Sequence, residues 1–465
     1  MTPQVLKSVC VLSGLLALAG CGDGDRDFGA PREKRPQPVD LVLMEDGRPA
    51  PEVLADDQTI RRGNGEEPET LDPHLAQGVP AARILRDLFE GLTAESADGE
   101  LVPGAALRWN ISRDARTYTF YLRRDLTWSN GDLLTVNDFV YSLRRAVNPE
   151  TASSAARTLL PILNAREVLA GELPVEELGI SLLDEFTMQI TLTGPTPYFL
   201  GLLASPVAFP VHRGNVEEFG DQFSRPGNLV SNGAYILKSW TPRVSIELEK
   251  NPNYREAGST LIERAVYLPT EDRAAEVKQF RAGELDWTNE VPNNQFRWLQ
   301  KNYPDELVVS PWMGSYFFGF NLTQEPFIDN PSLRMALIFS IDRKIITEKV
   351  TQFGEKPSFS LVPPGIDGYV PFSPEYADWP QEEREHEARR LYEQAGYSED
   401  EPLRVEIRYN TSDNHKKIAL AIASMWKQVL GVNATLVNEE FRVFLQNREQ
   451  KVILSLIHIS EPTRL

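Results

Sequence analysis

The sequence predicts an α/β protein with mixed sheets. Segments in which apolar and polar residues alternate, such as Thr117–Leu122, are separated by segments with apolar residues at helical spacing, such as residues 83–92. Strands that alternate with helices of about 10–15 residues indicate α/β domains. The chain has 465 residues, of which 41% are hydrophobic, so it can bury the cores of two or three domains.

The first part of the chain contains strands and helices with clear boundary signals. Residues 59–73 read as a short strand and a turn, and Thr135 with Asp138 three residues later predicts the start of a helix through Ala146. The Asn130-Gly131 pair predicts a turn. Further strands are expected at 187–192, 245–248 and 264–268.

The second part continues the same alternation. Pro331 begins an apolar periodic segment that predicts one long helix over residues 331–350. Other helices are expected at 273–282, 387–394, 416–430 and 440–448. Strands are expected at 285–287, 403–409 and 432–437.

The N-terminus resembles a bacterial lipoprotein signal. Lys7 precedes a short apolar run, and Leu18-Ala19-Gly20-Cys21 resembles a cleavage site at which Cys21 is acylated. The run is shorter than the roughly 20 residues of a spanning helix. We therefore expect residues 1–20 to be a signal peptide and the protein to be lipid-anchored outside the cytoplasm. A plain secretory signal is the alternative. The Pro-rich polar residues 21–57 predict a tether.

Composition excludes several classes of protein. The formal net charge of −19 argues against binding nucleic acid or an anionic membrane surface. Both cysteines, Cys10 and Cys21, lie in the signal region, so a mature chain has no internal disulfide.

Motifs for catalysis are lacking. The sequence contains no Gly-rich phosphate loop, no His-Glu-x-x-His and no Gly-x-Ser-x-Gly. The five histidines show no metal-ligand spacing, and the acidic run 382–387 reads as a solvated helix face. We predict no catalytic residues, no metal site and no cofactor.

The last residues, 454–465, follow a well-patterned segment abruptly. The stretch LSLIHISEPTR resembles a translated adapter used in sequencing libraries, so we expect 454–465 to be a scar outside the fold. A genuine strand at LSLIHI is the alternative. Sequencing the source locus through codon 453 tests the interpretation, which predicts that the reading frame continues with a different sequence.

Several phrases, in order and spacing, resemble the extracytoplasmic oligopeptide-binding lipoproteins of peptide ABC importers, the OppA-like family 5 solute-binding proteins. They are RDLFEGL at 86–92, WSNGD with TVNDFVYS at 128–142, NGAYILKSW at 232–240, RAGELDW at 281–287 and YNTSDNHKK at 409–417. The resemblance extends from about Thr59 to Lys451. It implies the type II periplasmic binding protein fold, with two lobes built from three mixed-sheet domains.

The resemblance also implies domain boundaries. The first domain would comprise residues 58–90 and 215–312, the second 91–214 and the third 313–453. The closing part of the first domain would be missing.

The resemblance places candidate peptide-binding residues in three segments. Gln77, Gly78 and Val79 match a segment beside the peptide, with an ordinary loop as the alternative; relatives often have Glu at position 77. Asp413 and His415 match positions that face the C-terminal part of the peptide. The alternative there is a helix cap formed by Ser412 and Asp413 with a surface histidine.

Two further candidates lie near the end of the chain. Arg448 matches an arginine near the ligand, and Phe441 stands where an aromatic residue packs against it. A surface arginine and a core phenylalanine are the alternatives. Ala155 and Gly319 replace a pocket tyrosine and a pocket glutamate, so we expect an altered side-chain preference. The aspartate that pairs with the peptide α-amino group lies beyond Lys451, so we expect the complete gene product, but not this chain, to bind peptide.

The function implied is capture of an extended oligopeptide between two lobes and its delivery to an inner-membrane ABC permease. We expect a monomer in the periplasm or cell envelope, held at the membrane only through lipid, with no nucleic-acid partner. Alternatives are a receptor for murein tripeptide or dipeptide, an envelope peptidase lipoprotein, and a structural or chaperone-like envelope protein.

Overall fold

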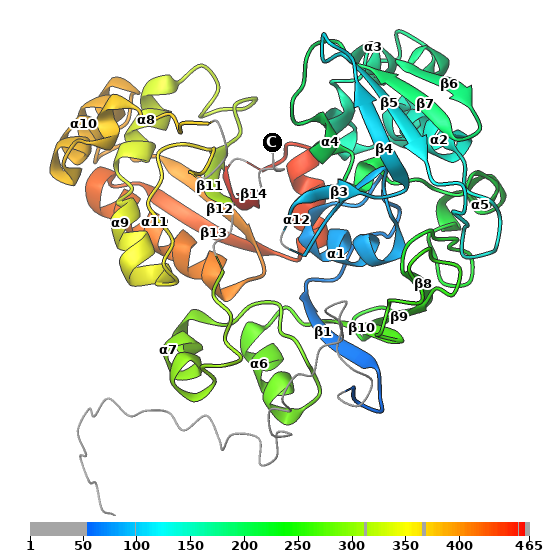
Figure 1. Ribbon diagram of the computed structural model, residues 1–465. Coiled ribbons are helices and arrows are strands. Elements are labelled where there is room, and N and C mark those ends of the chain that lie inside the picture. Colours follow the sequence, from blue (N-terminus) through cyan, green and yellow to red (C-terminus); the bar gives the residue numbers. More distant parts are fainter. Residues whose placement is uncertain (1–53, 98, 311–313, 365–368, 454, 461–465) are drawn as a thin grey trace, which may run out of the picture.

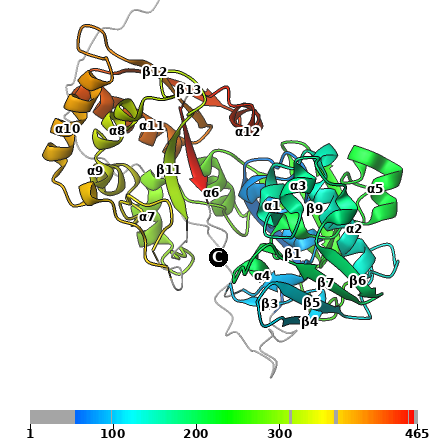
Figure 2. The ribbon, with the colours of Figure 1, turned by 90° about the horizontal axis from the view of Figure 1, so that it is seen from above.

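The computed structural model describes residues 54–97, 99–310, 314–364, 369–453 and 455–460. Figures 1 and 2 show two bodies. We call residues 59–269 the N-terminal lobe and residues 315–460 the C-terminal lobe. Cys21 and the predicted signal peptide lie outside the described residues, as does most of the predicted tether.

The first sheet of the N-terminal lobe has the order β1-β10-β9-β8. Its strands are β1 (Thr59–Gly65), β8 (Tyr235–Thr241), β9 (Ser245–Lys250) and β10 (Arg264–Pro269). β1 and β10 are parallel, and the other neighbours are antiparallel. The strands predicted at 245–248 and 264–268 are confirmed. The end of helix α1 (Gly78–Leu88) is bonded to the loop before β8, because Gly233 N donates to Leu88 O at 2.8 Å.

The second sheet is antiparallel, with the order β4-β5-β7-β6. Its strands are β4 (Ala106–Ile111), β5 (Thr117–Leu122), β6 (Ile180–Asp184) and β7 (Thr187–Thr191), and a small pair is formed by β2 (Thr93–Glu95) and β3 (Leu101–Pro103). Helix α2 (Val136–Val147) begins with the predicted capping box of Thr135 and Asp138. Tyr118, Phe120 and Leu122 alternate into the core. Shorter helices complete this part: α3 (Ala165–Leu169), α4 (Phe199–Leu202) and α5 (Arg213–Phe219).

The sheet of the C-terminal lobe has the order β11-β14-β12-β13. Its strands are β11 (Ser315–Phe320), β12 (Arg404–Asn410), β13 (Asn433–Glu439) and β14 (Ser455–Ser460). The helices are α8 (Pro331–Phe339), α9 (Arg343–Ile345), α10 (Gln381–Gln394), α11 (Asp413–Leu430) and α12 (Phe441–Glu449). Trp426 of α11 is fully buried, and its Nε1 donates to Leu337 O at 3.0 Å. This bond fixes α11 against α8.

One predicted helix is wrong in its extent. The segment 331–350 forms α8, then α9, and then a π-helical turn at Ile346–Thr351 instead of a single helix. Asp342 explains the break, since its Oδ1 accepts hydrogen bonds from Lys344 N and Ile345 N and so caps a new helical start. The strand predicted at 285–287 is reduced to one bridge between Trp287 and Arg62.

The segment expected to lie outside the fold is partly a strand. β14 pairs antiparallel with β11, with Ser455 opposite Phe320 and Ser460 opposite Ser315. The side-chain pattern of LSLIHI is compatible with a strand, and its backbone pairs with that of β11. The origin of 454–465 in an adapter, and the domain boundaries inferred from the resemblance, stay predictions.

Two helices connect the lobes. α6 (Arg273–Ala282) and α7 (Asn293–Asn302) pack on each other through Val277, Leu299 and Tyr303. Figure 1 shows them below the two lobes, between β1 and the C-terminal lobe. Within the described part of the chain, no helix combines the length and hydrophobicity that crossing a bilayer requires.

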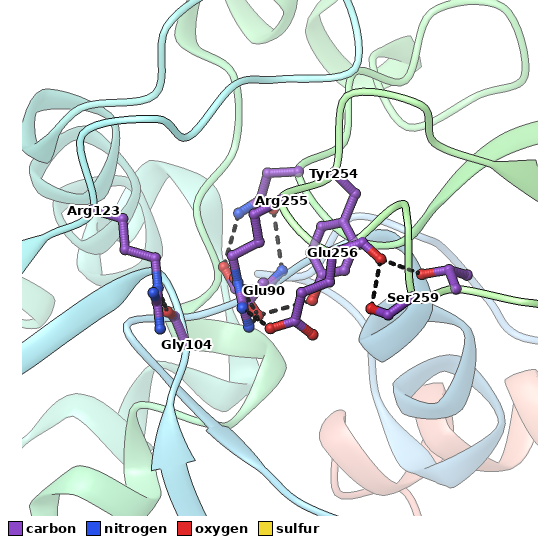
Figure 3. A network of polar contacts seen from close by, with 9 residues as sticks. Glu90, Gly104, Arg123, Tyr254, Arg255, Glu256 and Ser259 are labelled. Carbon is purple, nitrogen blue, oxygen red and sulfur yellow. Dashed lines mark hydrogen bonds and ion pairs between the residues drawn. The ribbon is translucent and has the colours of Figure 1, made fainter. Parts of the chain in front are cut away.

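A polar network fixes the end of α1 (Figure 3). Glu90, just after α1, forms an ion pair with Arg255 at 2.7 Å, and the two side chains are only 9% and 14% exposed. Tyr254 OH donates to Glu90 Oε1 at 3.0 Å. The backbone N and O of Glu90 both bond to the side chain of Asn232, at 3.1 and 2.9 Å. Both the charge and the backbone of Glu90 are therefore satisfied by residues of the first sheet and its loops.

We predict that Arg255→Met lowers the free energy of unfolding by about 3–5 kcal/mol, because it leaves the carboxylate of Glu90 buried without its cation. Urea unfolding checks this value. The double variant Glu90→Leu/Arg255→Met removes the unpaired charge and recovers part of the loss. Lys238→Met is the matched control, since Lys238 and Glu249 form an exposed pair worth about 1 kcal/mol or less. Equal losses for Arg255→Met and Lys238→Met would contradict the prediction.

Candidate functional site

Four of the predicted peptide-binding residues lie together where the lobes meet. Arg448 Nη2 donates to Gln77 Oε1 at 3.0 Å. A Cβ built on Gly78 would lie 3.1 Å from Phe441 Cζ, so the ring of Phe441 covers this glycine. Gln77 and Gly78 are at the start of α1, and Phe441 and Arg448 are at the two ends of α12. The site therefore consists of two helix segments from different lobes.

Local structure explains why these helices begin where they do. Gln77 has an extended backbone, and Gly78 has φ +76°, a left-handed conformation that favours glycine. The chain can thus turn sharply into α1. On the other side, Glu440 caps α12, because its Oε2 accepts from Arg442 N at 3.0 Å and from Val443 N at 3.3 Å.

Two glutamates complete the surroundings of Gln77, and the sequence analysis missed both. Glu449 accepts a hydrogen bond from Gln77 Nε2 at 2.5 Å, and the carboxylate of Glu69 accepts one from Gln77 N. Glu449 adjoins Arg448, which was a signal that it lies near the site. Glu69 had no signal, because its contact with Gln77 depends on how the loop between β1 and α1 folds.

Burial shifts the ionisation of this cluster. Burial raises the pKa of Glu69 to about 7, while hydrogen bonds from backbone amides and the charge of Arg442 oppose the rise. Burial also lowers the pKa of Arg448, which the neighbouring carboxylate of Glu449 partly offsets. Arg442 makes a further bond between the lobes, from its Nη2 to Pro68 O at 2.8 Å.

The other predicted residues are placed differently. Val79 is half-buried in the first turn of α1, and Asp413 is exposed in the first turn of α11. Ser412 caps α11 by accepting from His415 N, as the alternative interpretation held. His415 itself is buried rather than on the surface, with 7% of the residue exposed.

His415 is connected to the N-terminal lobe through Asn410. His415 Nδ1 lies 2.8 Å from Asn410 Oδ1, and Asn410 Nδ2 donates to Glu66 Oε1 at 3.3 Å. Since the Asn410 amide donates to Glu66, its oxygen accepts, and His415 carries the proton on Nδ1. The histidine ring also lies 5.6 Å from the ring of Tyr316.

Ala155 and Gly319 are the two positions at which this chain differs from the family that it resembles. Ala155 is half-buried against the core of the N-terminal lobe. Gly319 lies in β11, where the nearest atoms to an added Cβ belong to the ring of Phe317, at 3.7 Å. An added Cβ at position 319 therefore meets its neighbours only at ordinary van der Waals distance. Among the described residues, no group of three or more His, Cys, Asp or Glu side chains is arranged to hold a metal ion.

A buried carboxylate joins the connecting helices to β1. Glu276 of α6 is 0% exposed and lies against Gly63, where an added Cβ would be 1.5 Å from Glu276 Oε1. Asn289 N donates to Glu276 Oε1 at 3.1 Å, and Glu276 Oε2 has no partner among the described residues. Burial raises the pKa of Glu276 to about 7; the amides of Asn289 and Glu290 oppose this rise.

Comparisons with known proteins agree with this architecture. The profile of the bacterial extracellular solute-binding proteins, family 5, matches residues 100–460. The periplasmic oligopeptide-binding protein OppA of Escherichia coli K12 is 43% identical over 405 residues, which cover 86% of this chain and 74% of OppA. The periplasmic murein peptide-binding protein MppA of the same organism is 38% identical over 402 residues, with the same two coverages.

Two solved structures distinguish the arrangement of the lobes. Haemophilus influenzae OppA in complex with the peptide RPPGFSPFR superimposes with a TM-score of 0.85 at 36% identity, covering 88% of this chain and 80% of that one. The unliganded open form of MppA gives 0.59 at 37% identity, with coverages of 88% and 79%. Because identity and coverage are nearly equal, we attribute the difference to lobe placement. The lobes here are arranged as in the peptide complex.

We predict that Glu276→Gln stabilises the protein above pH 7 and not at pH 5. A folded-state pKa raised from 4.5 to about 7 means that the folded protein binds the additional proton between these values, so ionisation costs stability as pH rises through this window. The full shift corresponds to about 3 kcal/mol. Urea unfolding at pH 5 and pH 8 measures it, with the exposed Glu393→Gln as control. The same effect at both pH values would contradict the prediction.

Proposed function

This chain belongs to the bacterial extracellular solute-binding proteins of family 5, and on that premise we propose that it binds oligopeptides in an extended conformation between its two lobes. Members of this family are binding proteins, not enzymes. The resemblance, the two-lobed mixed-sheet fold and the absence of catalysis that the sequence predicted are therefore confirmed.

One observation carries the proposal: the lobes meet at α1 and α12 through Gln77 and Arg448, in the arrangement that OppA has in its peptide complex. A peptide in an extended conformation offers the same backbone groups whatever its sequence. Each such hydrogen bond contributes about 1 kcal/mol net. Several of them together with charge pairing reach the roughly 8 kcal/mol of a micromolar complex.

We assign the predicted residues to parts of this site. Gln77, Gly78 and Val79 lie along the peptide main chain, and Phe441 and Arg448 contact it from the C-terminal lobe. Asp413 and His415 face the C-terminal part of the peptide. The altered positions Ala155 and Gly319 change which side chains are accepted.

The same proposal includes the cellular context. OppA and MppA are named as periplasmic proteins, and a periplasmic location supports delivery of peptide to an inner-membrane ABC permease. Acylation of Cys21 would hold the protein at the membrane, and we expect a monomer. No nucleic acid is expected as a partner, given the net charge of −19.

A murein peptide is the second candidate ligand, because MppA is nearly as similar to this chain as OppA is. Both ligands carry carboxylates that suit Arg448, so the recognition chemistry overlaps. The difference between them lies in stereochemistry and side chains. Direct titration therefore has to include both ligand types.

We predict micromolar binding of oligopeptides by isothermal titration calorimetry, and weaker binding of murein tripeptide. Arg448→Met should weaken peptide binding by about 10–100-fold, since a charged hydrogen bond contributes about 1.5–3 kcal/mol. Lys427→Met, on an exposed part of α11, is the control. Mass spectrometry of the peptide after incubation tests the peptidase alternative, for which cleavage products are required.

The titration is run on the protein from the sequenced source locus and on the 465-residue chain. The locus product is expected to bind peptide. Absence of saturable binding of every peptide by the locus product would overturn the proposed function. Tight binding of murein tripeptide alone would replace it with the second candidate.

A further inference from the structure

We propose that Glu449 is a positioning residue that orients the amide of Gln77, and that Gln77, Arg448 and Glu449 form a latch between the lobes. Glu449 is absent from the predicted peptide-binding residues. The latch concerns the balance between closed and open lobe arrangements, which the protein has whether or not a peptide is its ligand. It therefore goes beyond the proposed function.

The order of charges on α12 selects one orientation of the amide. Arg448 and Glu449 are adjacent in the last turn of the helix, so a single side chain from the other lobe can reach both. Gln77 Nε2 donates to Glu449 Oε1 at 2.5 Å, and Gln77 Oε1 accepts from Arg448 at 3.0 Å. A reversed amide would place donor against donor and acceptor against acceptor. Glu449 and Arg448 thus both favour the orientation in which Gln77 presents its oxygen to Arg448.

Neighbouring contacts hold the two helices at this distance. The ring of Phe441 lies over Gly78, and Arg442 Nη2 donates to Pro68 O at 2.8 Å. Both residues come from the first turn of α12, whereas Arg448 and Glu449 come from its last turn. Contacts at both ends of one helix resist its rotation as well as its displacement from α1.

The charge balance explains why a neutral residue is needed at position 77. Glu69 and Glu449 are both bonded to Gln77, one through its backbone and one through its amide. A glutamate at position 77 would keep its pairing with Arg448, but it would lose the hydrogen bond to Glu449 and bring a third carboxylate beside these two. The residues at 77 and 449 are therefore coupled: one amide and one carboxylate satisfy Arg448, and two carboxylates repel each other.

Small-angle X-ray scattering of the 465-residue chain without peptide tests the latch. The profile gives the ratio of closed to open arrangements when it is fitted with this structure and with an opened one. We expect Gln77→Glu to lower the closed-to-open ratio about tenfold, because the hydrogen bond to Glu449 is replaced by a contact between like charges while the pairing with Arg448 is kept. The double variant Gln77→Glu/Glu449→Gln exchanges the carboxylate and the amide and should restore the ratio to within about twofold.

Two further variants distinguish the positioning role of Glu449 from a general loss of structure. Gln77→Ala removes both bonds, so adding Glu449→Gln should not rescue it. Glu393→Gln makes the same chemical change on an exposed face of α10 and should leave the profile unchanged. Circular dichroism establishes whether each variant is folded. If Gln77→Glu is not folded, the comparison of Gln77→Ala with the wild-type chain tests the latch instead.

The latch would be overturned by a wild-type profile that fits the open arrangement, by an unchanged profile for Gln77→Glu, or by an expansion that Glu449→Gln does not reverse. Because no peptide is present, these outcomes do not depend on the ligand. A chain that fails to bind every peptide but shows the rescue would keep the latch and lose the proposed function.

Discussion

The buried ion pair of Glu90 and Arg255 fixes one end of α1, and the interlobe site depends on the other end of the same helix. An α-helix rises about 1.5 Å per residue and is stiff over this length, so an error in position at Glu90 would be transmitted to Gln77. Asn232 strengthens the constraint because it bonds to both backbone groups of Glu90. The helix start that faces the C-terminal lobe is therefore positioned by residues far from it.

The opposite half of the site has its own support. Glu439, at the end of β13, accepts from Arg408 at 2.6 Å and from Asn447 of α12 at 2.7 Å. Glu440 then caps α12 directly. Strand and helix thus form one rigid unit, which carries Phe441 and Arg448. The two surfaces that meet between the lobes are therefore pre-organised, so little side-chain entropy is lost in their contact.

Patterns among a few neighbouring residues correctly predicted the strands and helix starts that depend on interactions between those residues. The alternation in β5 and the capping box at Thr135 are properties of a few neighbouring residues, and both are present. The break in the helix after Phe339 was missed, although Asp342 is a favourable N-cap, because the apolar periodicity continues across it. An N-cap residue inside a continuous apolar stripe does not by itself show whether the segment forms two short helices or one long helix, because packing decides between them.

The residues of the candidate site were harder to predict from the sequence than the elements of the fold. Gln77 and Arg448 were found only through a family resemblance, since 371 residues separate them and no periodicity relates them. Glu69, Glu276 and Glu449 were missed for the same reason. These glutamates are distinguished by their partners in other elements and, for Glu69 and Glu276, by their burial. Neither property can be predicted from the pattern of charges along the chain.

The residue at position 77 illustrates how such distant contacts constrain a sequence. Two unit charges about 4 Å apart interact with about 4 kcal/mol when the effective dielectric constant is about 20. Glu449 is exposed, so the repulsion between carboxylates at 77 and 449 would be smaller, about 1 kcal/mol, and the pairing with Arg448 would oppose it. With Glu449 in place, an amide at 77 bonds to both neighbours on α12 without that repulsion. Gln77 thus matches a glutamate that lies 372 residues away in the sequence.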